Sequence, residues 1–177
     1  MNQLLRLLVG ICLRRLGPQD LPYSIPLLRG LVLVAVGLQV LFSLLLRGEV
    51  AVHRLLLGVV LTLGLPWLVL QWRQRRARYV QTLTALVGTG ILFAIAMAPL
   101  LWLSVDMPPP SEGTPPTPRQ AFVSIAAICL VAWKIAVDGH IWRHALGWPL
   151  AGGVLLALGL FLLELGIEQV LFPVALQ

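Results

Sequence analysis

The stretch "QWRQRRARYV", residues 71–80, lies between two long apolar runs and sets the topology of the chain. The chain as a whole is 59% hydrophobic and only 11% charged, with a mean hydropathy of +0.92. In soluble domains, about a quarter of the residues are charged. The apolar excess of this chain therefore cannot be buried in one water-soluble core, and part of it must face lipid. We therefore interpret the four arginines of the stretch as a short connection between two membrane spans: Arg73, Arg75, Arg76 and Arg78.

Five segments are long and apolar enough to cross a bilayer, which takes roughly 20 apolar residues for about 30 Å of hydrocarbon. They are residues 27–46, 51–72, 79–103, 120–137 and 145–172. Backbone groups must be paired within each segment in lipid, and none of the segments alternates polar and apolar residues, so we expect helices and not barrel strands. The predicted fold class is all-α: a polytopic bundle of five transmembrane helices over residues 27–172.

Residues 1–26 predict a cytoplasmic amphipathic helix followed by a proline-containing linker. At 100° per residue, the polar residues of this segment fall on one side of a helix, and the leucines, Val9 and Ile11 fall mostly on the other. Arg15 is the exception to this pattern. The polar side holds Asn2, Gln3, Arg6, Gly10 and Arg14. This pattern is typical of a helix lying in the membrane surface, here ended by Gly17-Pro18.

The arginine connection also predicts an orientation, because positive charge in short loops stays on the cytoplasmic side. The cytoplasmic set then contains Arg6, Arg14, Arg15, Arg29, the four connection arginines, Lys134 and Arg143, and the outer set contains Arg47, Arg54 and Arg119. We expect a cytoplasmic N-terminus, a periplasmic C-terminus and a hydrated, proline-rich periplasmic loop at residues 104–119. The single lysine among thirteen basic residues suggests a GC-rich bacterial genome, and hence the bacterial inner membrane.

Three pairs of polar side chains have the four-residue spacing that places them on one helix face: Lys134–Asp138, His140–His144 and Glu164–Glu168. We expect the lysine and aspartate to pair, with the lysine reaching the interface. The glutamates could bind a cation or relay protons. Because no acidic or histidine cluster occurs in another span, we favour a role in capping the polar outer end of the last helix. Two histidines alone make a weak metal site, so no metal or cofactor is expected.

No nucleophile or phosphate-binding motif is present, because the chain contains no GxSxG, Walker or CxxC pattern. We therefore expect no enzymatic activity, and inert, buried thiols at Cys12 and Cys129. Small residues four apart predict close helix packing, either within the bundle or towards a partner. They are Ala85–Thr89, Ala94–Ala98, Ala132–Ala136 and Gly153–Ala157, together with the "GTG" of residues 88–90.

A basic N-terminal segment followed by five closely spaced spans resembles the Yip1-like family of small membrane proteins. The resemblance is carried by "LVAWKIAVDGHIWRHALGWPLAGGVLLALGLFLL", residues 130–163, with its tryptophan-bearing span, short basic turn and glycine-rich last helix. "RRLGPQDLPYS", residues 14–24, is similar to the start of a group of proteobacterial inner-membrane proteins. The resemblance implies a five-helix bundle without catalytic residues. The eukaryotic family's signature between the first spans has no counterpart here, so trafficking functions are not implied.

Two functions are compatible with these patterns. The first is a non-enzymatic scaffold or accessory subunit of a membrane assembly, with a protein partner or a second copy bound through small-residue faces and no nucleic acid. The alternative is a small transporter or channel subunit with a polar path formed by Gln39, Lys134, Asp138, Glu164 and Glu168. The two hypotheses differ in whether these five side chains face one cavity or scatter to the membrane interfaces.

Overall fold

The computed structural model describes residues 2–105, 107 and 115–172, so half of the expected proline-rich loop, residues 104–119, lies outside the described residues. The described part folds into α-helices and two 3-10 turns, η1 (Pro18–Asp20) and η2 (Arg76–Arg78), and contains no strand. The helices are α1 (Asn2–Cys12), α2 (Ile25–Arg47), α3 (Val52–Trp72), α4 (Tyr79–Ser104), α5 (Pro118–Leu146) and α6 (Leu150–Leu171). Helices α2 to α6 are each long and apolar enough to span a membrane, which confirms the predicted fold class.

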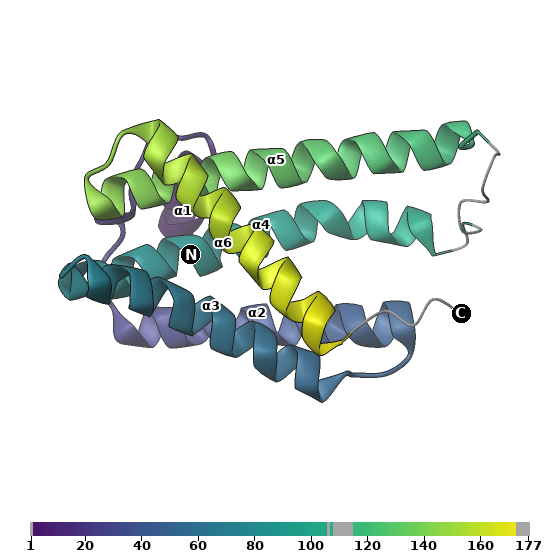
Figure 1. Ribbon diagram of the computed structural model, residues 1–177, viewed down its shortest axis with the longest axis horizontal. Helices are drawn as coiled ribbons and strands as arrows, with labels where there is room; N and C mark the ends of the chain where they lie inside the picture. The colour runs from purple at the N-terminus through teal and green to yellow at the C-terminus, as the bar shows by residue number, and fades with distance from the viewer. Residues whose placement is uncertain (1, 106, 108–114, 173–177) are drawn as a thin grey trace.

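The five spans run up and down, so that the connections fall into two groups at opposite ends of the bundle (Figure 1). The arginine connection, the α5–α6 turn and the N-terminal segment share one end. The other end holds the α2–α3 connection, the C-terminal ends of α4 and α6, and the N-terminal end of α5. Two turns are set by glycines in the left-handed region, Gly48 (φ 73°) after α2 and Gly147 (φ 70°) after α5, where a side chain would be strained.

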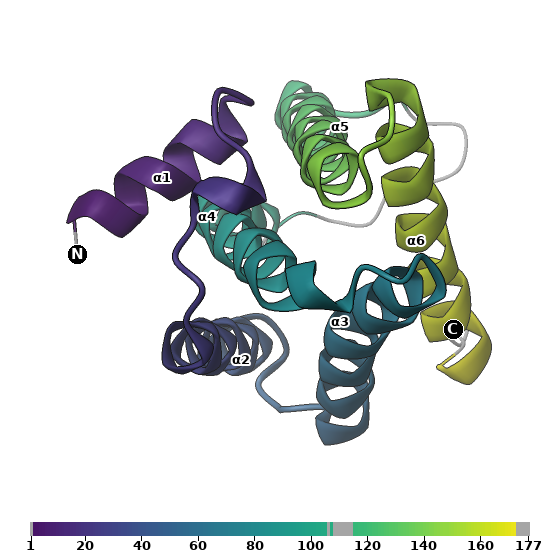
Figure 2. The same cartoon turned by 90° about the vertical axis from the view of Figure 1, so that its left-hand side faces the viewer.

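Helix α4 is the central helix, with α1, α2, α3 and α5 arranged around it in the end-on view (Figure 2). Two of its buried hydroxyl groups are satisfied within the helix: Thr84 donates to the carbonyl of Val80 at 2.6 Å and Thr89 to that of Ala85 at 2.8 Å. Gly88 lets α1 approach, because a Cβ there would lie 2.6 Å from a methyl group of Leu8. The predicted small-residue face at Ala85–Thr89 therefore packs within the bundle.

Helices α5 and α6 meet at a glycine contact. A Cβ on Gly139 would lie 2.7 Å from the Cα of Val154, and a Cβ on Gly153 would collide with the carbonyl of Gly139. Gly153 and Ala157 are buried, so this predicted packing face is also internal. Ala132, by contrast, is exposed on the outer side of α5.

The turn between the last two spans lies further along the chain than the sequence patterns predict. Helix α5 ends at Leu146 and not at Val137, and α6 starts at Leu150 and not at Ala145. The physical reason is that the helix-breaking signals are Gly147 and Pro149, whereas Gly139 continues the helix because α6 packs on it.

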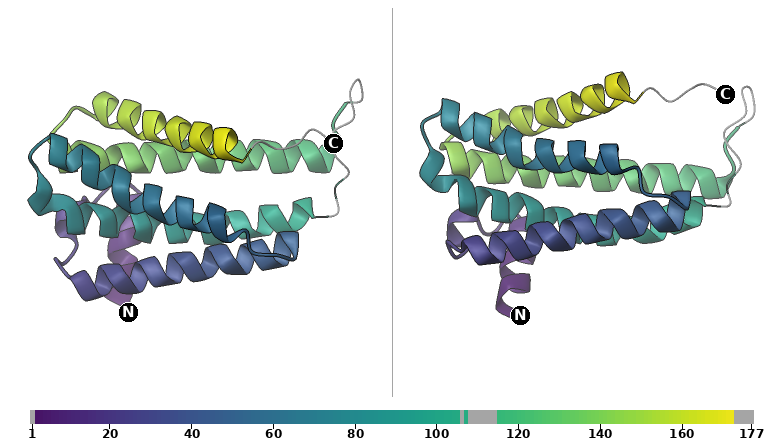
Figure 3. Two further views of the ribbon diagram at one scale, coloured as in Figure 1. Left: turned by 60° about the horizontal axis from the view of Figure 1, so that its bottom comes forward. Right: turned by 90° about the horizontal axis from the view of Figure 1, so that it is seen from below.

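Helix α1 runs across the bundle axis (Figure 3), as expected for a helix lying in the membrane surface. It is more firmly attached than the sequence predicts, because Leu8 and Ile11 are buried against α4 and α5, while Leu5 and Val9 stay exposed. Three hydrogen bonds hold the following segment. Trp133 Nε1 donates to the Cys12 carbonyl (3.1 Å), Gln81 Nε2 donates to the Leu21 carbonyl (2.8 Å), and His140 Nε2 lies 3.0 Å from the Leu16 carbonyl oxygen.

The two cysteines differ from each other. Cys12, the last residue of α1, is buried, and burial raises the pKa of its thiol. This agrees with the expected inert thiol. Cys129 lies exposed on α5, so the prediction that it is buried is wrong. The helix at this position turns its small polar side chain outward, because the opposite face of α5 packs on α4 and α6.

Candidate functional site

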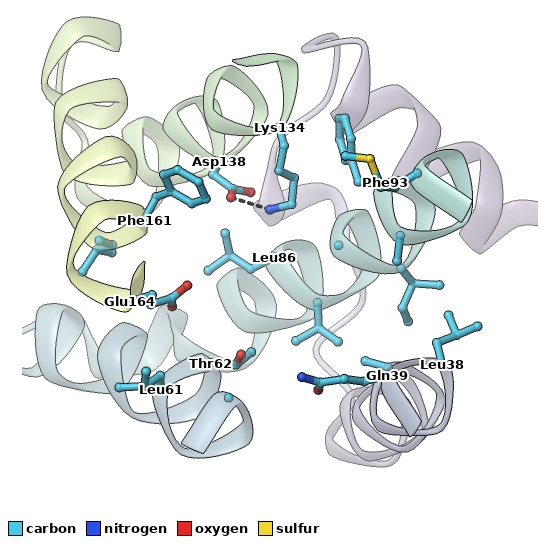
Figure 4. A pocket seen from close by; sticks show the side chains of 18 of the residues that line it. Leu38, Gln39, Leu61, Thr62, Leu86, Phe93, Lys134, Asp138, Phe161 and Glu164 are labelled. Carbon is cyan, nitrogen blue, oxygen red and sulfur yellow. Dashed lines mark hydrogen bonds and ion pairs between the residues drawn. The ribbon is translucent and has the colours of Figure 1, made fainter. Parts of the chain in front are cut away.

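A cavity of about 790 Å³ lies among helices α2 to α6 (Figure 4). Its volume is within the range of about 300–1,000 Å³ that is usual for small-molecule sites. Most of the residues that line it are apolar, and leucine is the most frequent. The polar side chains that line it are Gln39, Ser43, Arg54, Thr62, Lys134, Asp138, Glu164 and Glu168. The cavity thus contains all five residues of the polar path that the sequence suggested as an alternative.

Lys134 and Asp138 form an ion pair on the cavity wall provided by α5, as the spacing predicts. Their side chains are 27% and 21% exposed. Lys134 lies twelve residues before the end of α5, or about 18 Å along the helix axis, and is thus further from the helix end than a span ending at Val137 implies. The second carboxylate oxygen of Asp138, Oδ1, is buried and has no hydrogen-bond partner among the described residues. Buried polar atoms are normally bonded, so this wall has unused hydrogen-bonding capacity.

Glu164 points into the cavity from α6, across from the ion pair (Figure 4). It lies close enough to Lys134 and Asp138 to interact electrostatically, but within the described part of the chain it makes no hydrogen bond or ion pair. Because α6 starts at Leu150, Glu164 lies about 21 Å along the helix and seven residues before its end. The prediction that it caps the helix is therefore wrong, and its depth relative to the outer boundary stays a prediction.

The inward direction of Glu164 follows from the packing of α6. Gly153 and Glu164 are eleven residues apart, which at 100° per residue is three turns and about 20°, so the two residues share one helix face. The glycine contact with α5 turns this face towards the bundle near the α5–α6 turn. The carboxyl group then faces the bundle where α6 has moved away from α5 and a space remains (Figure 1).

At the outer end of the cavity, α3 and α6 are joined by one cluster of side chains. Arg54 Nη1 lies 3.7 Å from Glu168 Oε1, and the Arg54 guanidinium lies 5.4 Å from the centre of the Phe172 ring. The His53 and Phe172 rings are 4.5 Å apart. We call Arg54, Glu168, Phe172 and His53 the outer clasp. From the sequence, Arg54 is only one of the basic residues expected on the outer side of the membrane. An arginine inside a predicted span is itself a functional signal.

The floor of the cavity is polar but uncharged. Gln39 of α2 fits beside Gly58 of α3, where a Cβ would lie 3.3 Å from the Gln39 amide nitrogen. Thr62 of α3 lies on the same side (Figure 4). Both side chains are exposed, so the cavity is open on the side of α2 and α3.

The histidine pair lies outside the cavity. His140 contacts the Leu16 carbonyl, and its ring lies 4.6 Å from the ring of His144, edge to face. No group of three or more histidine, cysteine, aspartate or glutamate side chains that could hold a metal ion occurs in residues 2–105, 107 and 115–172. Through its contact with Leu16, His140 fastens the N-terminal segment to α5.

The arginine connection makes specific contacts at its end of the bundle. Arg78 Nη1 donates to the carbonyls of His144 (2.7 Å) and Ala145 (3.2 Å), which are free at the C-terminus of α5. The guanidinium of Arg73 lies 5.2 Å from the centre of the Trp148 ring. The connection thus clamps the α5–α6 turn to the end of α3, a role that spacing alone did not reveal.

Comparison of the chain with models of known protein families, with curated proteins and with solved structures finds no match. The functional argument therefore rests on the geometry of the cavity.

Proposed function

We propose that this integral membrane protein is a small transporter, or a channel subunit, whose cavity holds a polar solute within the membrane. The supporting observation is that charged and polar side chains from α2, α3, α5 and α6 line one space between the spans. Ionisable groups at membrane depth are expensive and mark solute, ion or proton pathways when they face a cavity. This is the condition that separates the transporter hypothesis from the scaffold hypothesis.

The energetics also favour a binding role over a purely structural one. Replacing a buried ion pair by apolar side chains of similar volume is often neutral or stabilising, so a bundle that served only as a scaffold would gain nothing from Lys134 and Asp138. Glu164, which has no ion-pair partner, adds a further cost. A solute that interacts with these groups would offset that cost.

We propose the orientation that the arginine connection favours, in a bacterial inner membrane, with the outer clasp on the periplasmic side. Of the ten basic residues that we expect on the cytoplasmic side, Lys134 is the one that lines the cavity. Alkaline phosphatase fused after Arg76 is expected to be inactive, and fused after Leu171 to be active. The reverse result would overturn the orientation. The resemblance to the Yip1-like family stays a prediction. The same membrane topology in this chain and in members of that family would support it.

Accessibility of the cavity to water tests the proposed function without knowledge of the solute. Thr62→Cys, in a chain with Cys12→Ala and Cys129→Ala, places one thiol in the cavity. Charged methanethiosulfonates react with thiolates in water, so a transport path is expected to allow labelling from either side of oriented vesicles.

The matched control is Val60→Cys on the same helix, because Val60 is 64% exposed and does not line the cavity. It is expected to react roughly tenfold more slowly, since its thiol would face lipid. Equal rates at the two positions, or labelling of Thr62→Cys from one side only, would contradict the proposed function and favour the scaffold hypothesis.

A further inference from the structure

We infer that the solute bound in the cavity is an organic cation with a single positive charge and an apolar body, such as a substituted ammonium compound. This inference rests on the proposed function, since it takes the cavity as a binding site, and it adds the chemical class of the solute. Three properties of the cavity support it: its charge balance, its size and its aromatic lining.

The charge balance of the lining favours a cation. Two positive side chains, Arg54 and Lys134, face three carboxyl groups, so the fully ionised lining carries one excess negative charge. Arg54 pairs with Glu168, and Lys134 pairs with Asp138. Glu164 is the carboxyl group left over. One positive charge neutralises this set, whereas an anion would add like charge to a partly desolvated site.

The size of the cavity favours an organic cation over an inorganic one. Calcium and magnesium are held by about six to eight oxygen ligands within about 2.6 Å, which needs a tight cluster of oxygen atoms. No such cluster of acidic side chains occurs in the described part of the chain. The cavity of about 790 Å³ has instead the volume of a site for a drug-sized molecule, and its mostly aliphatic wall can bury an apolar body.

The aromatic lining points in the same direction. One aromatic side chain comes from each of four helices: Phe42 from α2, Phe93 from α4, Trp142 from α5 and Phe161 from α6. Aromatic faces attract cations electrostatically and need no hydrogen-bond donor on the ligand. Phe161 lies three residues before Glu164 on the same face of α6, and both point into the cavity (Figure 4). A cation that contacts the carboxyl group would therefore lie beside an aromatic ring.

Two probes of the same shape and opposite charge test this inference. Tetraphenylphosphonium and tetraphenylborate are both bulky and apolar, but only the first is a cation. With the full chain in zwitterionic lipid nanodiscs, we expect saturable binding of tetraphenylphosphonium above the level of empty nanodiscs, and no saturable binding of tetraphenylborate. Equal binding of the two ions would show that the cavity selects apolar bulk and would overturn the inference.

Variants locate the binding site. Glu164→Gln removes the excess charge and is expected to weaken tetraphenylphosphonium binding roughly tenfold or more, because a charge partner is lost in a partly desolvated site. The matched control is Glu49→Gln, which removes one negative charge from an exposed connection outside the cavity and is expected to leave the affinity unchanged. Unchanged affinity in Glu164→Gln, or an equal loss in Glu49→Gln, would overturn the inference.

A second pair of variants keeps the carboxyl group and changes the ring. Phe161→Leu is expected to weaken binding by roughly threefold or more, and Phe161→Trp to restore it, since indole is the stronger cation partner. Failure of this pattern would exclude an aromatic contribution at this position and count against an organic cation. If Thr62→Cys is labelled from both sides but the cation does not bind, the proposed function stands and only the inference on its solute fails.

Discussion

At the scale of single residues, the Lys134–Asp138 pair places two charges between apolar spans. Each partner is less than one-third exposed, and Lys134 lies about 18 Å and Asp138 about 12 Å from the C-terminal end of α5. The attraction between the two charges mainly offsets the cost of removing them from water. Each charge is therefore tolerated because the other is present, and this dependence can be measured.

A double-mutant cycle tests that dependence. Lys134→Met leaves the Asp138 carboxyl group without its partner and is expected to destabilise the protein by about 3–5 kcal/mol. Lys134→Met combined with Asp138→Leu removes both charges and is expected to recover most of that loss. The free energy of unfolding in mixed detergent micelles measures both variants. If the double variant is as unstable as the single one, the pair contributes through packing and not through charge.

Glu164 shows what the sequence contains and what it leaves open. Its presence inside a span could be predicted from the sequence, and so could its position on the face of Gly153 and Ala157, from the spacing alone. The sequence could not show that this face turns towards the bundle, because that depends on which helix meets Gly153. For the same reason, the gathering of five polar residues in one cavity could be stated only as an alternative.

At the scale of helices, the existence of the spans could be predicted and some of their ends could not. Apolar length determines whether a segment crosses the membrane, and that information is local. The end of α5 depends on a competition between Gly139 and Gly147, both of which are helix-breaking by propensity. The close packing of Val154 on Gly139 holds the first in the helix, and Gly147 adopts the left-handed conformation. Because a tertiary contact decides which glycine ends the helix, residue type alone could not predict the end of α5.

The glycine contact between α5 and α6 gives a prediction about packing. Gly153→Ala places a methyl group against the Gly139 carbonyl, and 2.9 Å from the Arg143 amide nitrogen, so the helices must separate. We expect a loss of about 1–3 kcal/mol in the free energy of unfolding, as for other overpacked contacts. Gly159→Ala on the same helix is the control, since a Cβ there has no neighbour within 4 Å. It is expected to be neutral or stabilising by up to about 1 kcal/mol, through helix propensity.

A comparable loss in the two alanine variants would mean that α6 is sensitive to any added methyl group. The close approach at Gly139 would then not be what sets its position. A loss confined to Gly153→Ala is also expected to disturb the cavity, because the direction of Glu164 depends on the same contact.

At the scale of the whole molecule, the two ends of the bundle are fastened differently. The end with the arginine connection is held by many contacts, including the Arg78 bonds to the end of α5 and the attached α1. At the outer end, α3 meets α6 through the side chains of the outer clasp. Glu168 is 49% exposed, and an ion pair of this kind contributes about 0–1 kcal/mol. The outer end of the cavity is therefore the end at which the bundle can open at low cost.

Removal of the outer clasp is expected to increase access to the cavity without unfolding the protein. Arg54→Met breaks both the ion pair with Glu168 and the contact with the Phe172 ring, and should raise the labelling rate of Thr62→Cys from the periplasmic side roughly threefold or more. Arg119→Met removes another arginine from the same end, one that bonds the Leu103 carbonyl and does not line the cavity, and should leave the rate unchanged. Equal rates in the two variants would show that access is controlled elsewhere, and the clasp would then be only a surface contact.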